Sequence, residues 1–274
     1  MTPLLLVDGH HLLYRAWFGF PARIHSRDRS RDLTGVFGFL ALLRKTHREA
    51  VPDAEIIVVF DGENGAAARR RLDPSYKATR MNADHMPLAS LAPIKEALSD
   101  LRITWVEIDD SEGDDVIAAL ATIAAARGRT VICLSGDRDL HQLAAPTITI
   151  LTPERRQITP ATLVARYRVT PAQWPDYRAM TGDPADNIAG IRGIGPHTAA
   201  TLLAGGLHLE DLPSSDRLHG VRGAAINRAW LQLLIWRDMI RLNRTVPISP
   251  GLITDETTPP MPRAASILES LKLW

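Results

Sequence analysis

The stretch Leu4-Leu5-Leu6-Val7-Asp8-Gly9-His10-His11 joins an apolar run to an aspartate, and this combination decides the fold. Four apolar residues in a row, without alternation, are typical of a strand that is buried on both faces. A helical pattern follows at about residues 11–18, so the stretch predicts a strand that leads directly into a helix. The arrangement returns at residues 56–60, where a β-branched run ends at Asp61.

Strand and helix patterns alternate through the first half of the chain. Further strands are expected at residues 103–108 and 131–134, and helices at about 34–48, 88–101 and 114–127. Short apolar strands that alternate with helices predict an α/β fold with an open, doubly wound, mostly parallel sheet. Ligands of such sheets bind outside the carboxyl ends of the strands. After about residue 160 the strand signal stops, and helical patterns cover roughly 160–167, 171–180, 196–203 and 224–242.

Composition excludes several classes of protein. The chain has 274 residues, 45% hydrophobic and 23% charged, as expected for a globular protein of one large or two modest domains. Cys133 is the only cysteine, which excludes a disulfide scaffold and fits a reducing compartment. No apolar run approaches the ~20 residues of a membrane span, and the N-terminus lacks the basic lead of a signal peptide. These features predict a soluble cytoplasmic protein.

Acidic residues recur at the ends of the expected strands and near the starts of helices. They are Asp8, Asp61, Glu112, Asp114, Asp115, Asp137, Asp139, Asp183 and Asp186. In a doubly wound sheet several of them converge at one edge, where they repel one another unless cations lie among them. Oxygen ligands without His or Cys suit Mg²⁺ or Mn²⁺, and two such ions support phosphodiester hydrolysis.

Each acid alone has a simpler interpretation, because an aspartate after a strand is usually a turn residue or a helix cap. Glu112, Asp114 and Asp115 follow Ser111 and could simply complement a helix dipole. Paired acids favour a site, since a cap needs no pair. The charge balance also favours a site. With the nine acids set aside, 22 acids remain against 32 basic residues, so the remaining surface carries about +10 and suits a polyanion.

Two other segments suggest phosphate binding. Gly190-Ile191-Arg192-Gly193-Ile194-Gly195-Pro196-His197-Thr198 places a glycine-rich turn before a proline suited to a first helical turn. Exposed amides there would bind phosphate without reading base sequence, although an ordinary helix–helix hairpin explains the segment equally well. In Tyr76-Lys77-Ala78-Thr79-Arg80, a helix would place Lys77 and Arg80 on one face beside Tyr76 as a stacking surface, or would form a solvated basic face.

Taken together and in order, these motifs resemble the 5′-3′ exonuclease domain of bacterial DNA polymerase I and the flap endonucleases. The matching segments are residues 6–15, 59–61, 76–80, 112–116, 136–140 and 181–195. The resemblance implies a PIN-like nuclease domain over 1–165 with a helical arch at about 62–92, and a helix-3-turn-helix DNA-binding region over 166–245. It leaves the tail at 246–274 unassigned. It further implies cleavage of 5′ ends or flaps of nicked or branched DNA, or of RNA–DNA primer hybrids, in replication or repair. A monomer is the default expectation.

The resemblance also implies roles for individual residues. Two or more Mg²⁺ or Mn²⁺ ions are expected at Asp8, Asp61, Glu112, Asp114, Asp137, Asp139 and Asp186, with Asp115 and Asp183 matching further acids of bacterial members. Lys77 and Arg80 match the basic pair that contacts the phosphate near the cut. The DNA contacts expected are Arg15, Tyr76, Lys77, Arg80, Gly190, Arg192, Gly193, Gly195, His197 and Thr198. The hairpin at 190–198 also implies a K⁺ site.

Some residues depart from the family pattern. Gly113 stands where alanine is usual, and Arg192 and His197 replace the usual lysines of the hairpin. No polymerase region follows residue 274, so a stand-alone nuclease or a piece of a longer protein is expected. Two other functions stay open: a branched-DNA-binding protein with little or no catalysis, and a PIN-type ribonuclease.

Overall fold

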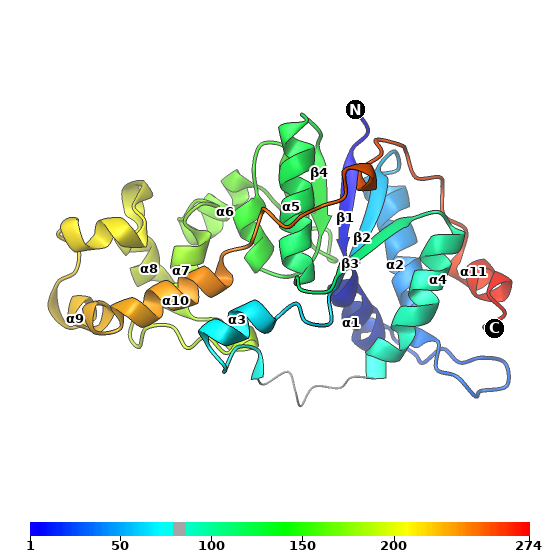
Figure 1. Cartoon of the computed structure of the whole chain (residues 1–274), viewed down its shortest axis with the longest axis horizontal. Coiled ribbons are helices and arrows are strands. Elements are labelled where there is room, and N and C mark those ends of the chain that lie inside the picture. The colour runs from blue at the N-terminus through cyan, green and yellow to red at the C-terminus, as the bar shows by residue number, and fades with distance from the viewer. Residues whose placement is uncertain (79–85) are drawn as a thin grey trace.

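One six-stranded sheet organises the first part of the chain (Figure 1). The computed structural model describes residues 1–78 and 86–274. The strands are β1 (Leu4–Asp8), β2 (Glu55–Asp61), β3 (Thr104–Ile108), β4 (Val131–Leu134), β5 (Ile148–Leu151) and β6 (Gln157–Ile158). They lie in the order β3-β2-β1-β4-β5-β6, all neighbours parallel except β5 and β6. The predicted mostly parallel sheet is confirmed, and β5 and β6 extend it beyond the four strands expected.

Helices cover both faces of the sheet, as a doubly wound fold requires. Leu5 and Val7 share one core with α1 (Gly9–Gly19), α2 (Thr34–Ala50) and α4 (Leu91–Asp100). Leu4 and Leu6 face the opposite core, which contains α5 (Gly113–Ala126). Because successive side chains of a strand point to opposite faces, one apolar run serves two cores.

A helical region lies on the α5 side of the sheet (Figure 1). Its helices are α6 (Pro160–Tyr167), α7 (Trp174–Thr181), α8 (Pro196–Leu202), α9 (Gly220–Arg228) and α10 (Trp230–Ile240), and α10 packs along α7. The remaining elements are α3 (Ala67–Leu72) and α11 (Ala264–Ser270), with 3₁₀ turns at Met86–Ser90, Asp139–Leu143, Pro184–Asp186, Ala204–Gly206, Leu209–Ser214 and Pro250–Leu252. No helix of the described residues is long and apolar enough to cross a membrane.

The single helix predicted over residues 224–242 is wrong. The helical conformation is interrupted at Ala229, whose φ of −98° and ψ of 14° separate α9 from α10. Ile226 and Leu233, on either side of the break, are both fully buried. Packing of the two segments has overridden a periodicity that runs through the break.

The C-terminal tail returns across α5 to the sheet and ends on α2 as the short helix α11 (Figure 1). Glu55, at the start of β2, accepts hydrogen bonds from the backbone N–H groups of Thr254 (2.7 Å) and Asp255 (3.1 Å). Arg129 Nη1 donates to Glu55 Oε2 at 2.7 Å, and Arg129 Nε donates to the carbonyl of Thr2 at 2.8 Å. This buried ion pair therefore fastens both chain ends to the sheet.

Replacing Glu55 with alanine should lower the free energy of unfolding by about 3–5 kcal/mol, because Arg129 keeps its charge in the core without its main partner. Urea denaturation followed by circular dichroism measures this change. Glu256→Ala is the matched control, since Glu256 is an exposed acid of the same tail. A loss below about 1 kcal/mol, the value of a surface pair, would contradict the fastening role.

Candidate active site

The carboxyl ends of β1 and β2 each present an aspartate. Asp8 ends β1 and caps α1: its Oδ1 accepts the N–H of His11 at 2.9 Å, and its Oδ2 accepts the hydroxyl of Ser135 at 2.7 Å. Asp61 ends β2, and its Oδ1 accepts the N–H of Gly113 at 2.7 Å, which joins it to the start of α5. Asp8 and Asp61 are therefore cap or turn residues and site residues at the same time. The hydrogen bonds that complete the turns also hold the carboxylates at one sheet edge.

Neighbouring acids at this edge raise one another's pKa. Burial raises the pKa of Asp8, and the charge of Asp61 raises it further although His11 acts in the opposite direction. Burial also raises the pKa of Asp114, in the first turn of α5, well above its usual range, reinforced by Asp137 and Asp8. Burial and like charges both disfavour the ionised carboxylates, and a bound cation would offset this cost.

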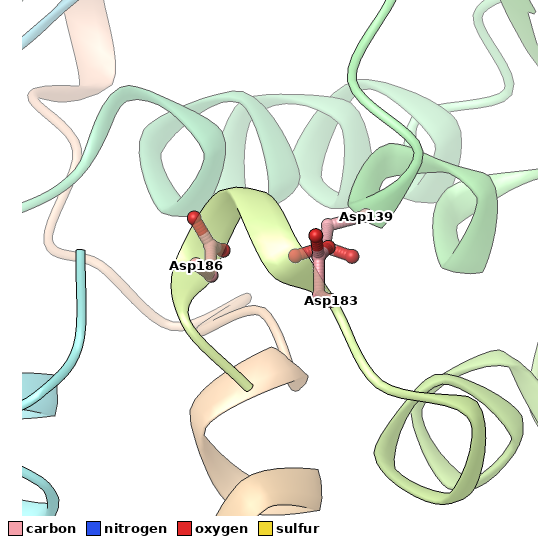
Figure 2. A group of neighbouring side chains, drawn as sticks. All are labelled: Asp139, Asp183 and Asp186. Atoms are coloured by element: carbon pink, nitrogen blue, oxygen red, sulfur yellow. The ribbon is translucent and has the colours of Figure 1, made fainter. Parts of the chain in front are cut away.

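Figure 2 shows a second group of acids. Asp139, Asp183 and Asp186 each offer one oxygen atom within 4.8 Å of the others. Asp139 follows β4, whereas Asp183 and Asp186 come from the 3₁₀ turn after α7. Burial, with the charges of Asp137 and Asp186, raises the pKa of Asp139 well above its usual range.

The donor set of this second group fits a divalent cation. Asp139 Oδ1 is buried and accepts no hydrogen bond from the described residues. Arg178 lies nearby, with its Nε 3.8 Å from that oxygen, while its Nη2 donates to Asp183 Oδ2. A buried carboxylate oxygen without a donor, surrounded by other carboxylates, is the environment that Mg²⁺ or Mn²⁺ satisfies.

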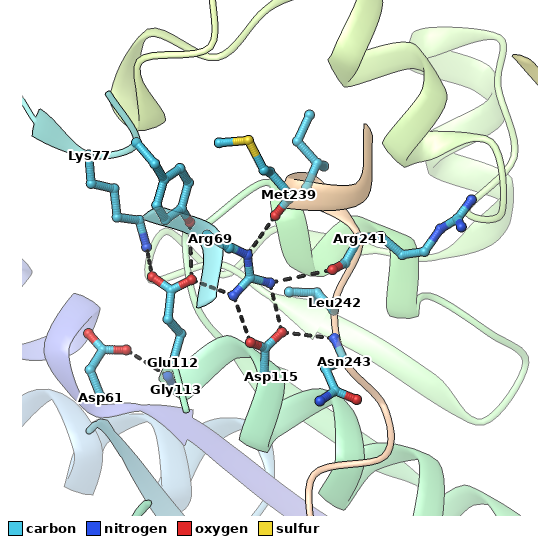
Figure 3. A network of polar contacts seen from close by, with 12 residues as sticks. Asp61, Arg69, Lys77, Glu112, Gly113, Asp115, Met239, Arg241, Leu242 and Asn243 are labelled. Carbon is cyan, nitrogen blue, oxygen red and sulfur yellow. Dashed lines mark hydrogen bonds and ion pairs between the residues drawn. The ribbon is translucent and has the colours of Figure 1, made fainter. Parts of the chain in front are cut away.

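Glu112 is held by cations and a hydroxyl rather than by the other acids (Figure 3). Its Oε1 accepts from Lys77 Nζ, and its Oε2 accepts from Tyr76 Oη at 3.1 Å and from Arg69 Nη1. Burial pushes the pKa of Glu112 upward, but the charges of Lys77 and Arg69 outweigh it and hold that pKa below its usual value. The positive charge of Lys77 also offsets a small part of the rise in the pKa of Asp114, so the ammonium acts on the acids at the sheet edge as well as on Glu112.

Several expectations for this region need correction. Lys77 adopts a φ of 54°, so residues 76–77 form a turn instead of a helix. Tyr76 is 3% exposed, which leaves no face for stacking on a base, and its hydroxyl supports Glu112 instead. Arg69 takes both oxygens of Asp115, at 2.7 and 2.8 Å, so the structure makes Asp115 a counter-ion rather than a free metal ligand. Thr79 and Arg80, with part of the expected arch, lie outside the described residues.

The arginines around the site differ in what the sequence revealed about them. Arg15 lies exposed on α1, where it pairs with Glu154 at 3.1 Å. Arg69 and Arg178 are both buried, and the sequence did not indicate that they contact the acids. A run of three arginines at 69–71 gave a signal of basic charge, but not of which member turns inward.

The glycine-rich hairpin at 190–198 presents its backbone to solvent. Gly190 and Gly193 have φ values of 69° and 86°, in the left-handed region that favours glycine. Ile191 and Ile194 are buried and anchor the loop, whereas Arg192, Gly193, Gly195 and His197 are exposed and Thr198 is half-buried. Pro196 forms the first turn of α8, and a Cβ atom at Gly193 or Gly195 would meet nothing within 4 Å.

A basic cavity adjoins this hairpin. It has a volume of about 290 Å³ and is lined by His197, Thr198, Thr201, Arg217, His219 and Arg222, among others. Arg217 donates to the carbonyl groups at the end of α8, so it is fixed beside the opening. The arrangement suits a phosphate group better than an apolar ligand.

Fold and site define an α/β protein with a carboxylate-lined sheet edge that suits divalent cations, beside a helical hairpin with exposed amides. The chain belongs to the 5′-3′ exonuclease family: residues 3–168 match its N-terminal resolvase-like domain, and residues 169–261 match its C-terminal SAM fold.

Similar sequences are bacterial DNA polymerases I. The thermostable DNA polymerase I of Thermus thermophilus is 41% identical over 209 residues, which are 76% of this chain and 24% of that protein. The thermostable enzyme of Thermus aquaticus is 36% identical over 270 residues, 98% of this chain and 32% of that protein. That of Mycobacterium tuberculosis is 34% identical over 252 residues, 90% and 28% of the two chains. The chain thus spans about a third or less of the length of these relatives.

Similar solved structures support the fold. A bacteriophage T5 flap endonuclease, in a pseudo-enzyme–product complex with DNA and metal ions, superposes with a TM-score of 0.71 at 19% identity, covering 88% of this chain and 89% of that one. The catalytic core of Rad2 in complex with DNA substrate superposes with a TM-score of 0.61 at 13% identity, covering 99% and 87%. At these identities the likeness concerns the fold.

Proposed function

We propose that this chain is a structure-specific 5′ nuclease that hydrolyses phosphodiester bonds at 5′ ends or flaps of nicked or branched DNA. The observation that carries the proposal is the buried cluster of Asp139, Asp183 and Asp186, whose carboxylate oxygens lie within 4.8 Å of one another and include an Asp139 oxygen that accepts no hydrogen bond from the described residues. Family membership and the basic hairpin support a nucleic-acid substrate. A protein that only binds DNA gains nothing from buried repulsion.

Each residue group has a distinct task in the proposed reaction. Asp8, Asp61, Asp114 and Asp137 hold one divalent cation, with Glu112 beside them, and Asp139, Asp183 and Asp186 hold a second. When bound, such ions supply charge neutralisation at the phosphodiester. Lys77 keeps one N–H on Glu112 and donates another to a non-bridging oxygen of the phosphate that is cut. Arg178 limits the repulsion between Asp139 and Asp183.

The hairpin and the cavity beside it grip the duplex backbone. The amides of the exposed residues 192, 193 and 195 and the side chains of Thr198, Arg217 and Arg222 bind phosphates without contacting bases. Carbonyl groups of the same loop hold a K⁺ ion. The enzyme acts in the cytoplasm as a monomer, in replication or repair, and also accepts RNA–DNA primer hybrids.

A labelled substrate tests the proposal directly. A 5′-labelled flap duplex is incubated with Mg²⁺, with Mn²⁺ and with EDTA, and plain single-stranded RNA serves as the competing substrate. We expect cleavage near the junction that requires metal and leaves the RNA intact. A gel shift of the flap without cleavage would instead identify a branched-DNA-binding protein, and preferential cleavage of the RNA would identify a PIN-type ribonuclease.

Replacing Gly193 with valine should weaken DNA binding about tenfold, because a β-branched residue strains the left-handed backbone and covers the exposed amides. The dissociation constant for flap DNA, measured in Ca²⁺ by fluorescence anisotropy, checks this. Gly206→Val is a matched control: its φ is 85° against 86° at Gly193, and both positions are open to solvent. Equal affinities of the two variants would remove the hairpin from the DNA interface.

A further inference from the structure

Arg69 joins three parts of the molecule that are far apart in the sequence (Figure 3). It lies in α3, and its side chain is only 10% exposed. Its Nε donates to the carbonyl of Met239 at 2.6 Å, and its two Nη atoms donate to both oxygens of Asp115. The remaining N–H groups donate to Glu112 Oε2 and to the carbonyl of Arg241, the latter at 3.4 Å. All five N–H groups of the guanidinium therefore have acceptors.

The charges around Arg69 explain why it tolerates burial. Burial disfavours the charged form, but hydrogen bonds to Asp115 and the charges of Glu112 and Asp115 outweigh it and raise the pKa of Arg69 above its usual value. Asp115 balances the guanidinium through a bidentate pair, and the N–H of Asn243 donates to the same carboxylate at 2.8 Å. Arg69 thus stays charged and fixed in one orientation.

Glu112 links the fixed guanidinium of Arg69 to the ammonium group of Lys77. Arg69 and Tyr76 both donate to Oε2 of Glu112, which directs the other oxygen, Oε1, to Lys77 Nζ. The Lys77 ammonium also lies 5.0 Å from the centre of the Tyr76 ring. A carboxylate pinned at one oxygen holds the partner of its other oxygen in a defined place.

The end of α10 is bonded to the acid-bearing elements a second time, through Gln142. Its Nε2 donates to the carbonyl groups of Asp139 and Ile240, both at 2.9 Å, and its Oε1 accepts the N–H of Leu242 at 3.0 Å. Residues 239–243 are therefore bonded to α3, to α5 and to the turn after β4. Since α10 packs along α7, which leads to the hairpin, this junction connects the DNA-binding region to the acids.

We propose that Arg69 is a positioning residue for Lys77: through Glu112 it fixes the ammonium at the acid edge, and through Met239 and Arg241 it ties that position to the DNA-binding region. Its catalytic consequence rests on the proposed nuclease function. Arg69 itself does not contact the substrate.

The variant Arg69→Met/Asp115→Leu tests the proposal without leaving a buried charge unpaired, because replacing a whole ion pair by apolar residues often preserves stability. We expect parental affinity for flap DNA in Ca²⁺ and a single-turnover cleavage rate reduced about 10–100-fold. Arg69→Lys is the second variant; it keeps the charge but loses the fork geometry, and should show an intermediate loss. Arg70→Met, an exposed neighbour in α3, is the matched control for charge and position.

A double-mutant cycle with Lys77→Ala separates positioning from a merely structural role. If Arg69 acts through Lys77, its substitution costs less than about twofold in rate once Lys77 is absent. A full additional loss in the Lys77→Ala background, or no loss in the parental background, would overturn the proposal.

A readout without cleavage keeps this inference apart from the proposed function. The chain has only four lysines, so ¹³C-dimethylation gives a simple spectrum in which Lys77→Arg identifies the Lys77 resonance. That resonance should shift in both Arg69 variants and stay unchanged in Arg70→Met. If the parent protein cleaves no substrate, the proposed function fails, whereas an unshifted Lys77 resonance overturns the role of Arg69.

Discussion

Asp139→Asn should abolish metal-dependent cleavage while making the metal-free protein more stable. The variant keeps the shape of the side chain but removes a charge that lies buried beside Asp137 and Asp186. Loss of a group that serves charge stabilisation at the reacting phosphate lowers the rate by about 10³-fold or more. The relief of repulsion should raise the melting temperature in EDTA by about 2–4 °C, corresponding to ~1 kcal/mol.

Single-turnover cleavage of a 5′-flap duplex and thermal denaturation in EDTA and in Mg²⁺ measure these effects. Addition of Mg²⁺ should stabilise the parent more than the variant, since a ligand that binds only the folded state raises its stability. Affinity for flap DNA in Ca²⁺ should stay close to the parental value. Parental cleavage by Asp139→Asn would remove this residue from the site, and a lower melting temperature in EDTA would show that its charge is compensated within the chain.

Lys77→Ala should reduce the rate of cleavage by about 10²–10³-fold with little change in DNA affinity, because the ammonium stabilises charge that develops at the phosphate. Glu112 loses its closest cation in this variant but keeps Arg69 and Tyr76, so the fold should survive. Single-turnover rates over a range of enzyme concentrations separate the rate from the affinity.

Two further variants sharpen this result. Lys77→Arg should recover only part of the rate, since a planar guanidinium does not replace a compact ammonium held by one carboxylate oxygen. Lys95→Ala is a matched control, because Lys95, in α4, also pairs with a glutamate, Glu107. A Lys77→Ala variant that binds DNA weakly yet cleaves at the parental rate when saturated would make Lys77 a binding residue only.

The sheet and its acidic edge were predictable because both depend on local patterns. Apolar runs at 4–7 and 56–60, each ending in aspartate, predict parallel strands, and parallel strands necessarily place Asp8 and Asp61 at one edge. The glycines and Pro196 of the hairpin likewise follow from backbone rules that act over a few residues. β6 escaped prediction because it has only two residues, whereas β5, which is as long as the predicted β4, was missed.

Local sequence patterns therefore indicate which acids end strands and which turn precedes α8. Long-range packing determines that Tyr76 is buried against Glu112, that Asp115 pairs with Arg69, and that α9 and α10 are separate helices. Tyr76 and Glu112 are 36 residues apart and Arg69 and Asp115 are 46 residues apart, so no local spacing reveals either pair. Burial selects one arginine from the run at 69–71 because only its side chain reaches Glu112, Asp115 and the end of α10 at the same time.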